Sequence, residues 1–339
     1  TFIKKWLWRI LNCFSKPMKE IVSFKKVIER ELKKIQLPSE PKNLYNPIHY
    51  ILNLDAKRIR SIALLITHQL YNEDYTKAIS AALAIEMFHN FTLIHDDIMD
   101  NASMRRGSLT VHEKWDKNIA ILSGDTLLVQ SYRMLFNLDS KIKELVLKKF
   151  SETAVIVCEG QQMDMDYEKE SSLQIKDYLL MIEKKTSVLF ASSFEIGAII
   201  GEATLEDQKL FYNFGLNLGI AFQLQDDLLD LYGDPSKFGK KIGGDVLTNK
   251  KTFLFLKALE LSNEDQHKTL MNFYSSTNFD DKKKIEAVKN IFDDLKIYKI
   301  TKDLISEYNS LAIDCSKQIT IENKDSLNYF INLLNKREV

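Results

Sequence analysis

The sequence is poor in the residues that interrupt helices. Among its 339 residues there are only 11 glycines and 5 prolines. Glycine and proline are the strongest helix breakers and the commonest turn residues, so their scarcity predicts long helices with short connections. No segment has the composition of a linker between domains. We therefore expect residues 1–339 to form one all-α domain.

Cysteine is also scarce, which bears on the compartment. Cys13, Cys158 and Cys315 are widely separated and lack the spacing of a metal site. A disulfide-stabilised secreted domain normally has more cysteines at closer intervals. The three residues indicate reduced thiols in a cytoplasmic protein.

The chain also has no net charge and no long apolar run. The first argues against a nucleic-acid partner, and the second against a membrane-spanning helix. Basic and acidic residues number 47 each, which argues against nucleic acid as a partner. No run reaches the roughly 18 apolar residues that a membrane-spanning helix needs.

The N-terminal residues 1–18 predict a basic amphipathic helix. Lys4, Lys5 and Arg9 interrupt a series of apolar residues at helical spacing. Such a helix can pack on its own protein or on a partner subunit, which is the usual fate of an apolar stripe. The alternative is a peripheral contact with a membrane surface.

The clearest signal in the chain is an acidic motif that occurs twice. Asp96-Asp97-Ile98-Met99-Asp100 and Asp226-Asp227-Leu228-Leu229-Asp230 share the pattern Asp-Asp-x-x-Asp, and each closes an apolar, helix-like run. On a helix, the first and last Asp lie on one face, where their like charges repel. Mg²⁺ bound with substrate phosphates would offset that repulsion. The two motifs therefore predict a site for Mg²⁺ and a polyphosphate.

Apolar periodicity places most of the chain in helices. We expect a basic loop over 101–110, a glycine-rich loop over 232–248 and a short segment that opens at Asn46-Pro47. The main expected helices are 19–34, 61–70, 76–100, 119–138, 141–166, 173–202 and 205–231, followed by further helices with polar breaks near 275–277 and 322–325.

Several segments around the two motifs resemble the trans-isoprenyl diphosphate synthases, the polyprenyl synthetase family. The similarity covers roughly residues 45–255, and seven matches occur in order. The matching segments are Ala56-Lys57-Arg58-Ile59-Arg60-Ser61, Glu86-Met87-Phe88-His89, His95 to Asp100, Arg105-Arg106-Gly107, Gly160-Gln161-Gln162-Met163-Asp164 with Lys185-Thr186, Phe222 to Asp227, and Gly239-Lys240 with Gly244-Asp245 to Thr252. Two backbone positions differ from the family pattern, because Asp55-Ala56 replaces paired glycines and Ser61 replaces a proline.

The resemblance implies a helical bundle around a deep central cavity, the isoprenoid synthase fold, and a set of residue roles. It implies three Mg²⁺ ions bound by Asp96, Asp100 and Asp226, with Asp230 as outer support. The residues implied to hold the allylic diphosphate are Arg105, Lys185 and Lys240, with Lys250 closing the pocket. The residues implied to hold isopentenyl diphosphate are Lys57, Arg60, His89 and Arg106. Thr186 and Gln223 are implied to direct oxygens at the allylic cation.

The residue types suit the implied reaction. Ionisation of an allylic diphosphate leaves a highly charged leaving group, which Mg²⁺ and clustered cations stabilise. The double bond of isopentenyl diphosphate then attacks the allylic cation, and a proton is lost. A homodimer is also implied by the family.

Two aromatic residues upstream of the first motif bear on product length. Phe91 and Phe88 lie five and eight residues before Asp96 and near its helix face. In the family, an aromatic residue at the fifth position before the motif is typical of short products. The resemblance favours geranylgeranyl diphosphate (C20), with farnesyl diphosphate (C15) as the alternative. Alternatively, both rings are simply residues of the hydrophobic core.

Two other functions compete with this one. A terpene synthase would ionise an allylic diphosphate without condensing it, and it would have no use for Lys57, Arg60, His89 and Arg106. A non-catalytic regulatory subunit would be expected to lose carboxylates from one motif, whereas both motifs are intact.

Overall fold

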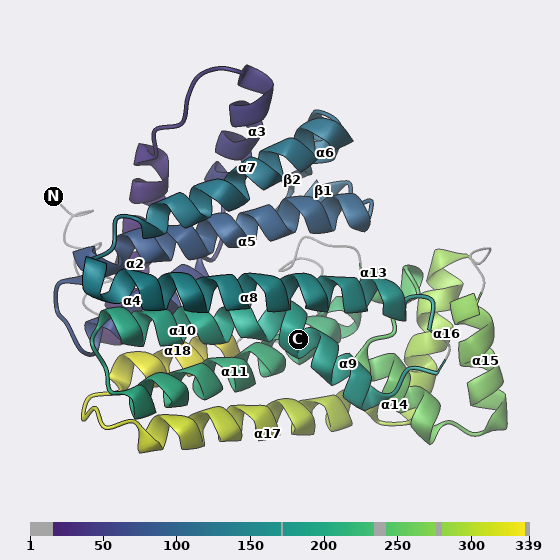
Figure 1. Cartoon of the computed structure of the whole chain (residues 1–339). Coiled ribbons are helices and arrows are strands. Elements are labelled where there is room, and N and C mark those ends of the chain that lie inside the picture. The colour runs from purple at the N-terminus through teal and green to yellow at the C-terminus, as the bar shows by residue number, and fades with distance from the viewer. Residues whose placement is uncertain (1–15, 171, 234–241, 276–279, 336–339) are drawn as a thin grey trace, which may run out of the picture. The chain divides into compact units, whose positions relative to one another are not determined.

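The computed structural model describes residues 16–170, 172–233, 242–275 and 280–335. Within these ranges the chain is almost entirely helical, with one short hairpin (Figure 1). The expected all-α class is therefore confirmed. No helix in the described ranges combines the length and apolar character needed to cross a bilayer.

The described chain divides into two compact units, which we call unit 1 and unit 2. Unit 1 comprises the described residues of 1–152 together with Ser192–Tyr212 and Ile319–Phe330. Unit 2 comprises Thr153–Ala191, Asn213–Gln318 and the described residues of 331–339. The expected single domain stays a prediction.

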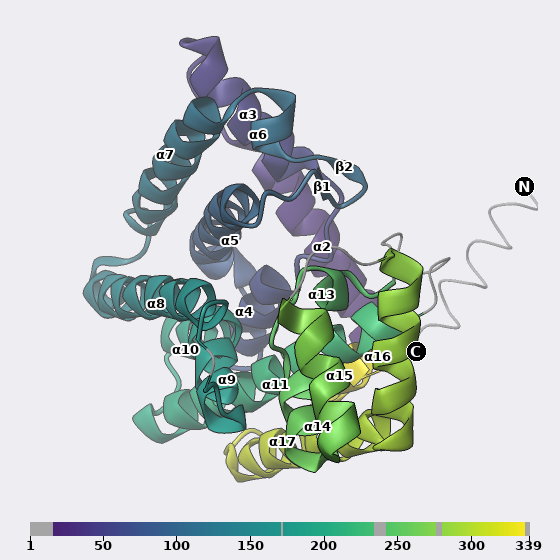
Figure 2. The ribbon, with the colours of Figure 1, turned by 90° about the vertical axis from the view of Figure 1, so that its right-hand side faces the viewer.

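Unit 1 is built around helix α5, Ile79–Met99, which is surrounded by shorter helices (Figure 2). Twelve of its residues are buried, so it forms the core of this unit and not an amphipathic surface helix. Its neighbours are α2 (Lys16–Lys34), α3 (Lys42–Asn53), α4 (Ile59–Gln69), η1 (Tyr75–Ala78), α6 (Val111–Lys114) and α7 (Lys117–Leu135). The hairpin strands β1 (Met104–Arg105) and β2 (Ser108–Leu109) follow α5.

Unit 2 has a separate apolar core. Its centre includes Leu224 and Leu228 of α11, Phe253 and Phe255 of α14 and Phe292 of α16. The helices wholly within it are α9 (Ile175–Ile182), η2 (Glu183–Ser187), α13 (Gly244–Leu247), α14 (Phe253–Leu261), α15 (Glu264–Ser275), α16 (Asp281–Asp294) and α17 (Ile297–Gln318). Helices α8 (Ser140–Tyr167), α10 (Val188–Ile200), α11 (Leu205–Tyr232) and α18 (Asp325–Asn335) contribute residues to both units.

The structure corrects three expected elements. Pro47 lies inside α3, which begins five residues earlier at Lys42, so it does not open the segment. The expected loop over 232–248 contains the one-turn helix α13, and 234–241 lie outside the described residues. The expected loop over 101–110 contains the two-stranded hairpin. Most of the N-terminal helix expected over 1–18 also lies outside the described residues.

Candidate active site

The first acidic motif occupies the last turn of α5. Asp96 is partly buried, Asp97 is only 1% exposed, and Asp100 is the exposed C-cap residue. Successive helix residues are rotated by about 100°, so Asp96 and Asp100 share a face while Asp97 points elsewhere. The motif thus offers two accessible carboxylates and one buried carboxylate.

Arg105 binds the buried carboxylate of this motif. Its Nε and Nη2 donate to Asp97 Oδ1 at 2.8 and 2.5 Å, and Nη2 also lies 3.3 Å from Asp96 Oδ2. Burial raises the pKa of the Asp97 carboxyl, and the hydrogen bonds from Arg105 oppose that effect. Arg105 therefore ties the hairpin to the end of α5.

Arg106 takes a different direction from Arg105 because of the hairpin turn. Arg106 and Gly107 have φ values of 54° and 73°, which a two-residue type I′ turn requires. Arg106 Nη1 donates to Asn90 Oδ1 at 3.2 Å. Burial lowers the pKa of Arg106 to about 10, although the Glu86 carboxylate raises it. The turn therefore directs the two adjacent arginines to different partners.

Glu86 supports these cations through a buried network that sequence reasoning missed. Arg58 Nη1 donates to Glu86 Oε1 at 2.6 Å, and both side chains are 2% exposed. Ser61 Oγ donates to Glu86 Oε2 at 2.9 Å, and Asn90 Nδ2 donates to Oε1 at 3.1 Å. Ser61 occupies the position where the family pattern has proline, so the substitution adds a hydrogen bond to this network.

His89 lies beside Arg60, and its imidazole is neutral. The nitrogens Arg60 Nη1 and His89 Nε2 are 3.2 Å apart. Burial lowers the pKa of His89 well below its usual value, and Arg60 lowers it further. Because the guanidinium can only donate, Nε2 accepts and the remaining nitrogen, Nδ1, carries the proton. Lys57, three residues before Arg60, is exposed.

Phe91 and Phe88 belong to an aromatic cluster within unit 1. Their ring centroids are 5.6 Å apart, and Phe88 also makes an edge contact with Phe150 of α8 at 5.4 Å. Tyr132 of α7 contacts Phe150 at 5.0 Å. Phe88 is 1% exposed and Phe91 is 8% exposed. Both rings lie within the core on the Asp96 helix, so a mutation at either must change core packing.

The second acidic motif lies near the end of α11. Asp226 and Asp230 are partly buried, while Asp227 is 5% exposed. Tyr178 Oη donates to Asp227 Oδ2, and Gln223 Nε2 donates to Oδ1 at 3.0 Å. Burial raises the pKa of Asp227 and the nearby Asp245 raises it further, against the effect of both hydrogen bonds. The middle Asp is again the buried one.

Asp230 supports the segment that follows α11. Its Oδ2 accepts from the backbone N–H of Asp245 at 2.9 Å, and its carbonyl accepts from Gly243 N–H at 2.7 Å. Gly243 has φ of 75°, a backbone conformation that favours glycine. Asp230 thereby holds the first turn of α13.

Lys185 and Thr186 lie in η2, a π-helical turn between α9 and α10. π-helical turns are rare and often occur at functional sites. A Cβ on Gly160 would lie 2.2 Å from Lys185 N, and one on Gly219 would lie 2.6 Å from Ser187 Cα. The two glycines therefore let α8 and α11 approach this turn closely.

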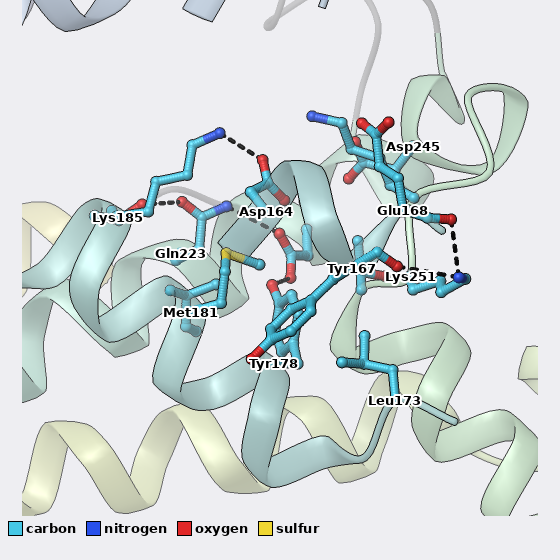
Figure 3. A pocket seen from close by; sticks show the side chains of 15 residues that line it. Asp164, Tyr167, Glu168, Leu173, Tyr178, Met181, Lys185, Gln223, Asp245 and Lys251 are labelled. Atoms are coloured by element: carbon cyan, nitrogen blue, oxygen red, sulfur yellow. Dashed lines mark hydrogen bonds and ion pairs between the residues drawn. The ribbon is translucent and has the colours of Figure 1, made fainter. Parts of the chain in front are cut away.

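A pocket of about 100 Å³ in unit 2 brings several predicted residues together (Figure 3). Lys185 Nζ donates to Asp164 Oδ2 at 2.6 Å, and Thr186 Oγ1 donates to Gln223 Oε1 at 3.1 Å. Lys250 also lines the pocket. Asp245 and Lys251 of the last matching segment line it too, as do Tyr178 and Met181, which sequence reasoning had not singled out. Lys240 lies outside the described residues.

Lys251 connects the pocket to the C-terminal end of α8. Its Nζ donates to the backbone carbonyls of Tyr167, Glu168 and Glu170 at 3.0, 3.0 and 2.5 Å. A lysine at the C-terminal end of a helix satisfies carbonyls that have no partner within the helix. No pattern in the sequence identifies this contact.

The carboxylates fit Mg²⁺ only when the ion arrives with a substrate. In the described ranges, no three His, Cys, Asp or Glu side chains converge closely enough to hold a metal by themselves. Asp96 and Asp226 are accessible oxygen donors, as is Asp100. Because Mg²⁺ commonly takes one or two carboxylates and completes its shell with phosphate oxygens and water, this donor set suits a metal–diphosphate complex.

Unit 1 carries the first motif and the residues predicted to hold isopentenyl diphosphate. Unit 2 carries the second motif and the pocket with Lys185, Thr186, Gln223 and Lys250, whereas Arg105, also predicted to hold the allylic diphosphate, lies in unit 1. Asp164, which ends one of the segments that resemble the family, is the ion-pair partner of Lys185. The residues that sequence reasoning missed, among them Tyr178 and Glu86, are those that support predicted residues from neighbouring helices.

Known proteins resemble this chain in sequence and in fold. The sequence profile of the family described as "Polyprenyl synthetase" matches residues 41–292. The short chain isoprenyl diphosphate synthase of Methanocaldococcus jannaschii is 39% identical over 73% of this chain and 75% of its own length. The geranylgeranyl pyrophosphate synthase of Geoglobus acetivorans is 40% identical over 69% of this chain and 74% of its own length.

A solved structure of a geranylgeranyl pyrophosphate synthase has 40% sequence identity to this chain and a TM-score of 0.89, covering 94% of this chain and 99% of its own. Its likeness confirms the expected isoprenoid synthase fold. The chain therefore belongs to the polyprenyl synthetase family, and it is a prenyltransferase of the short-chain prenyl diphosphate synthase type.

Proposed function

We propose that this enzyme condenses isopentenyl diphosphate with an allylic diphosphate and stops at all-trans geranylgeranyl diphosphate. The allylic substrate is dimethylallyl, geranyl or farnesyl diphosphate. The observation that carries the C20 product is the aromatic cluster on the Asp96 helix, with Phe91 one turn and Phe88 two turns before the motif. Relatives include geranylfarnesyl as well as geranylgeranyl diphosphate synthases, so product length needs its own test.

We assign metal binding to the accessible carboxylates Asp96, Asp100 and Asp226, with Asp230 as outer support. When bound, three Mg²⁺ ions supply positive charge to the leaving diphosphate. A polyprenyl synthase from Caulobacter crescentus CB15, 22% identical to this chain with a TM-score of 0.83, was solved with calcium and isoprenyl diphosphate. The buried Asp97 and Asp227 take no part in metal binding in this assignment.

The chain's own cations hold the two diphosphates. Lys185, Arg105, Lys240 and Lys250 hold the allylic diphosphate, and Lys57, Arg60, His89 and Arg106 hold isopentenyl diphosphate. Lys185 pairs with Asp164, and Arg105 pairs with Asp97. A diphosphate that binds Lys185 must therefore compete with the Asp164 carboxylate. His89 contributes a hydrogen bond from its imidazole.

Thr186 and Gln223 act on the allylic cation. Their hydroxyl and carbonyl oxygens lie at the pocket and present partial negative charge to the carbon that loses diphosphate. The double bond of isopentenyl diphosphate attacks that carbon, and a proton leaves the resulting cation. The apolar helices around the site keep out water, which would otherwise trap the cation.

Product chromatography after phosphatase treatment tests this function. Incubation with isopentenyl and farnesyl diphosphates should give geranylgeraniol. Farnesol as the final product from geranyl diphosphate would assign the C15 alternative. A hydrocarbon product would indicate a terpene synthase, and no product would indicate a regulatory subunit.

We also propose that the enzyme is a homodimer. Helix α7 and the residue after it carry four strongly exposed apolar side chains, Ile121, Leu122, Val129 and Phe136, with exposures from 41% to 60%. Leu122, Val129 and Phe136 are seven residues apart and so share a face of the helix, and exposed apolar faces of this kind often mark contacts with another chain. Light scattering at micromolar concentration should give twice the monomer mass of 39.4 kDa, and the monomer mass would contradict the proposal.

A further inference from the structure

Four side chains in unit 2 form one continuous line of hydrogen bonds. Tyr178 Oη donates to Asp227, and Gln223 Nε2 donates to the other oxygen of the same carboxyl group at 3.0 Å. Thr186 Oγ1 then donates to Gln223 Oε1 at 3.1 Å. All four residues line the same pocket.

The line has a direction because its members are not interchangeable. Gln223 has a donating end and an accepting end, and only the accepting end can receive the Thr186 proton. Asp227 offers an accepting oxygen at Oδ1, because Tyr178 donates to its other oxygen, Oδ2. Gln223 must then turn its NH₂ group toward Asp227 and its carbonyl toward Thr186.

The two inner members are well placed to fix this direction. Tyr178 and Asp227 are 3% and 5% exposed, while Thr186 and Gln223 are only partly buried. Solvent therefore has little access to the fixed end of the line. Buried hydrogen-bonding groups left without partners cost free energy, so reversal at the buried end is disfavoured.

We propose that Tyr178 and Asp227 are positioning residues that hold the Gln223 amide with its carbonyl oxygen toward Thr186 and the pocket. This inference rests on the prenyl transfer proposed above, in which that oxygen faces the allylic cation. If the amide reversed, its NH₂ group would present partial positive charge to the cation. The orientation of the Gln223 amide thus decides whether it stabilises or repels the positive charge on the reacting carbon.

Swapping the amide and carboxyl groups tests this role. Asp227→Asn offers an NH₂ group to Gln223 and favours amide reversal, so kcat should fall about 100-fold, as when one preorganised hydrogen-bonding group is lost. Gln223→Glu alone places two carboxyl groups against each other and should lower kcat by a similar factor. The double variant Asp227→Asn with Gln223→Glu restores an NH₂ donor to an accepting oxygen and leaves a second oxygen for Thr186. It should recover to within about tenfold of wild type.

Tyr178 sets the orientation of residue 227 and provides the second test. Tyr178→Phe alone leaves Gln223 bound to Asp227 and should lower kcat by less than about tenfold, the loss of one hydrogen bond. Combined with Asp227→Asn, it removes the hydroxyl that holds the Asn oxygen away from Gln223, so the Asn side chain can turn that oxygen toward the Gln223 NH₂ group. The pair should therefore be more active than Asp227→Asn alone. Equal activity of these two variants would contradict the role of Tyr178.

Three readouts separate this role from a general structural or metal effect. The KM values for both diphosphates and the half-saturating Mg²⁺ concentration should change by less than about threefold in each variant. Activity of Asp227→Asn that excess Mg²⁺ restores would assign Asp227 to charge and overturn the proposal. Failure of the double variant to exceed both single variants would also overturn it.

Side-chain amide exchange gives a readout independent of catalysis. In ¹⁵N-glutamine-labelled protein, the Gln223 NH₂ signal is the one lost in Gln223→Glu. Its protons should exchange at least about tenfold more slowly than those of exposed glutamines, and Asp227→Asn should remove the protection. Equal exchange rates in the wild type would reject the fixed amide. A wild type that forms no prenyl diphosphate would instead reject the proposed function.

Discussion

The two acidic motifs share one spacing but differ in what binds their middle residue. In the first motif Asp97 binds the charged guanidinium of Arg105, which comes from a hairpin eight residues later. In the second motif Asp227 binds two neutral groups, Tyr178 and Gln223. In both motifs the middle Asp is the most buried of the three.

The comparison shows that one five-residue pattern contains two kinds of position. Helix geometry places the first and last carboxylates on one face and turns the second toward the protein. The first positions, Asp96 and Asp226, are both accessible, whereas the last positions differ, because Asp230 accepts from the Asp245 N–H and Asp100 is exposed. The middle residue instead binds the protein around it. Asp97 forms an ion pair in unit 1, and Asp227 accepts hydrogen bonds from neutral groups in unit 2.

The largest expected effect tests whether the first positions of the two motifs are equivalent. Asp96→Ala and Asp226→Ala should each lower kcat by at least about 100- to 1,000-fold, because each removes a ligand for charge that develops on the leaving group. Steady-state assays at saturating Mg²⁺ measure the effect. Unchanged circular dichroism should show that the fold persists. Near wild-type turnover in either variant would break the equivalence.

Product length should depend on the core of unit 1 and not on that of unit 2. Phe91→Ala removes a ring from the proposed floor, so it should lengthen the product by about one isoprene unit and cost roughly 3–5 kcal/mol of stability. The double variant with Phe88→Ala should lengthen it further.

Phe292→Ala is the matched control, since Phe292 is a ring of the unit 2 core that is only 1% exposed. It should lower stability by a similar amount with no change in product. Chromatography of the dephosphorylated products gives the product length of both variants, Phe91→Ala and Phe292→Ala. A wild-type product from Phe91→Ala would place the floor elsewhere.

The partners of the middle residues should differ in their contribution to stability. Arg105→Leu leaves the Asp97 charge buried without its ion pair and should lower the free energy of unfolding by about 3 kcal/mol. Tyr178→Phe removes one neutral hydrogen bond and should cost about 1 kcal/mol. Urea unfolding followed by circular dichroism compares the two. Equal losses would show that the charge of the partner is unimportant.

The smallest kinetic effect concerns the two adjacent arginines. Arg106→Ala should raise the KM for isopentenyl diphosphate about tenfold, and Arg105→Ala should raise the KM for the allylic substrate by a similar factor, each through one charge-assisted contact. Each KM is measured with the other substrate saturating. If either variant raised both KM values equally, the assignment of Arg105 and Arg106 to different substrates would be wrong.

Sequence reasoning identified positions that depend on local periodicity. The paired faces of Asp96 with Asp100, and of Phe88 with Phe91, follow from the 3.6-residue repeat of one helix. It could not identify Arg58 with Glu86 or Tyr178 with Asp227, because each pair is joined by packing between segments 28 and 49 residues apart. The π-helical turn at Lys185 depends on close approach at Gly160 and Gly219, and no local pattern reveals that approach. Pro47 inside α3 shows the reverse case, in which tertiary packing overrides a local breaker.

The three carbonyl contacts of Lys251 have a consequence for proteolysis. Trypsin must take a lysine side chain into its own specificity pocket, yet this ammonium is already bound to the end of α8. Cleavage after Lys251 requires that end of the helix to release it first. Because Lys250 lines the pocket one residue away, the rate of nicking at Lys251 would report how often this wall of the pocket opens, and a bound diphosphate should slow it.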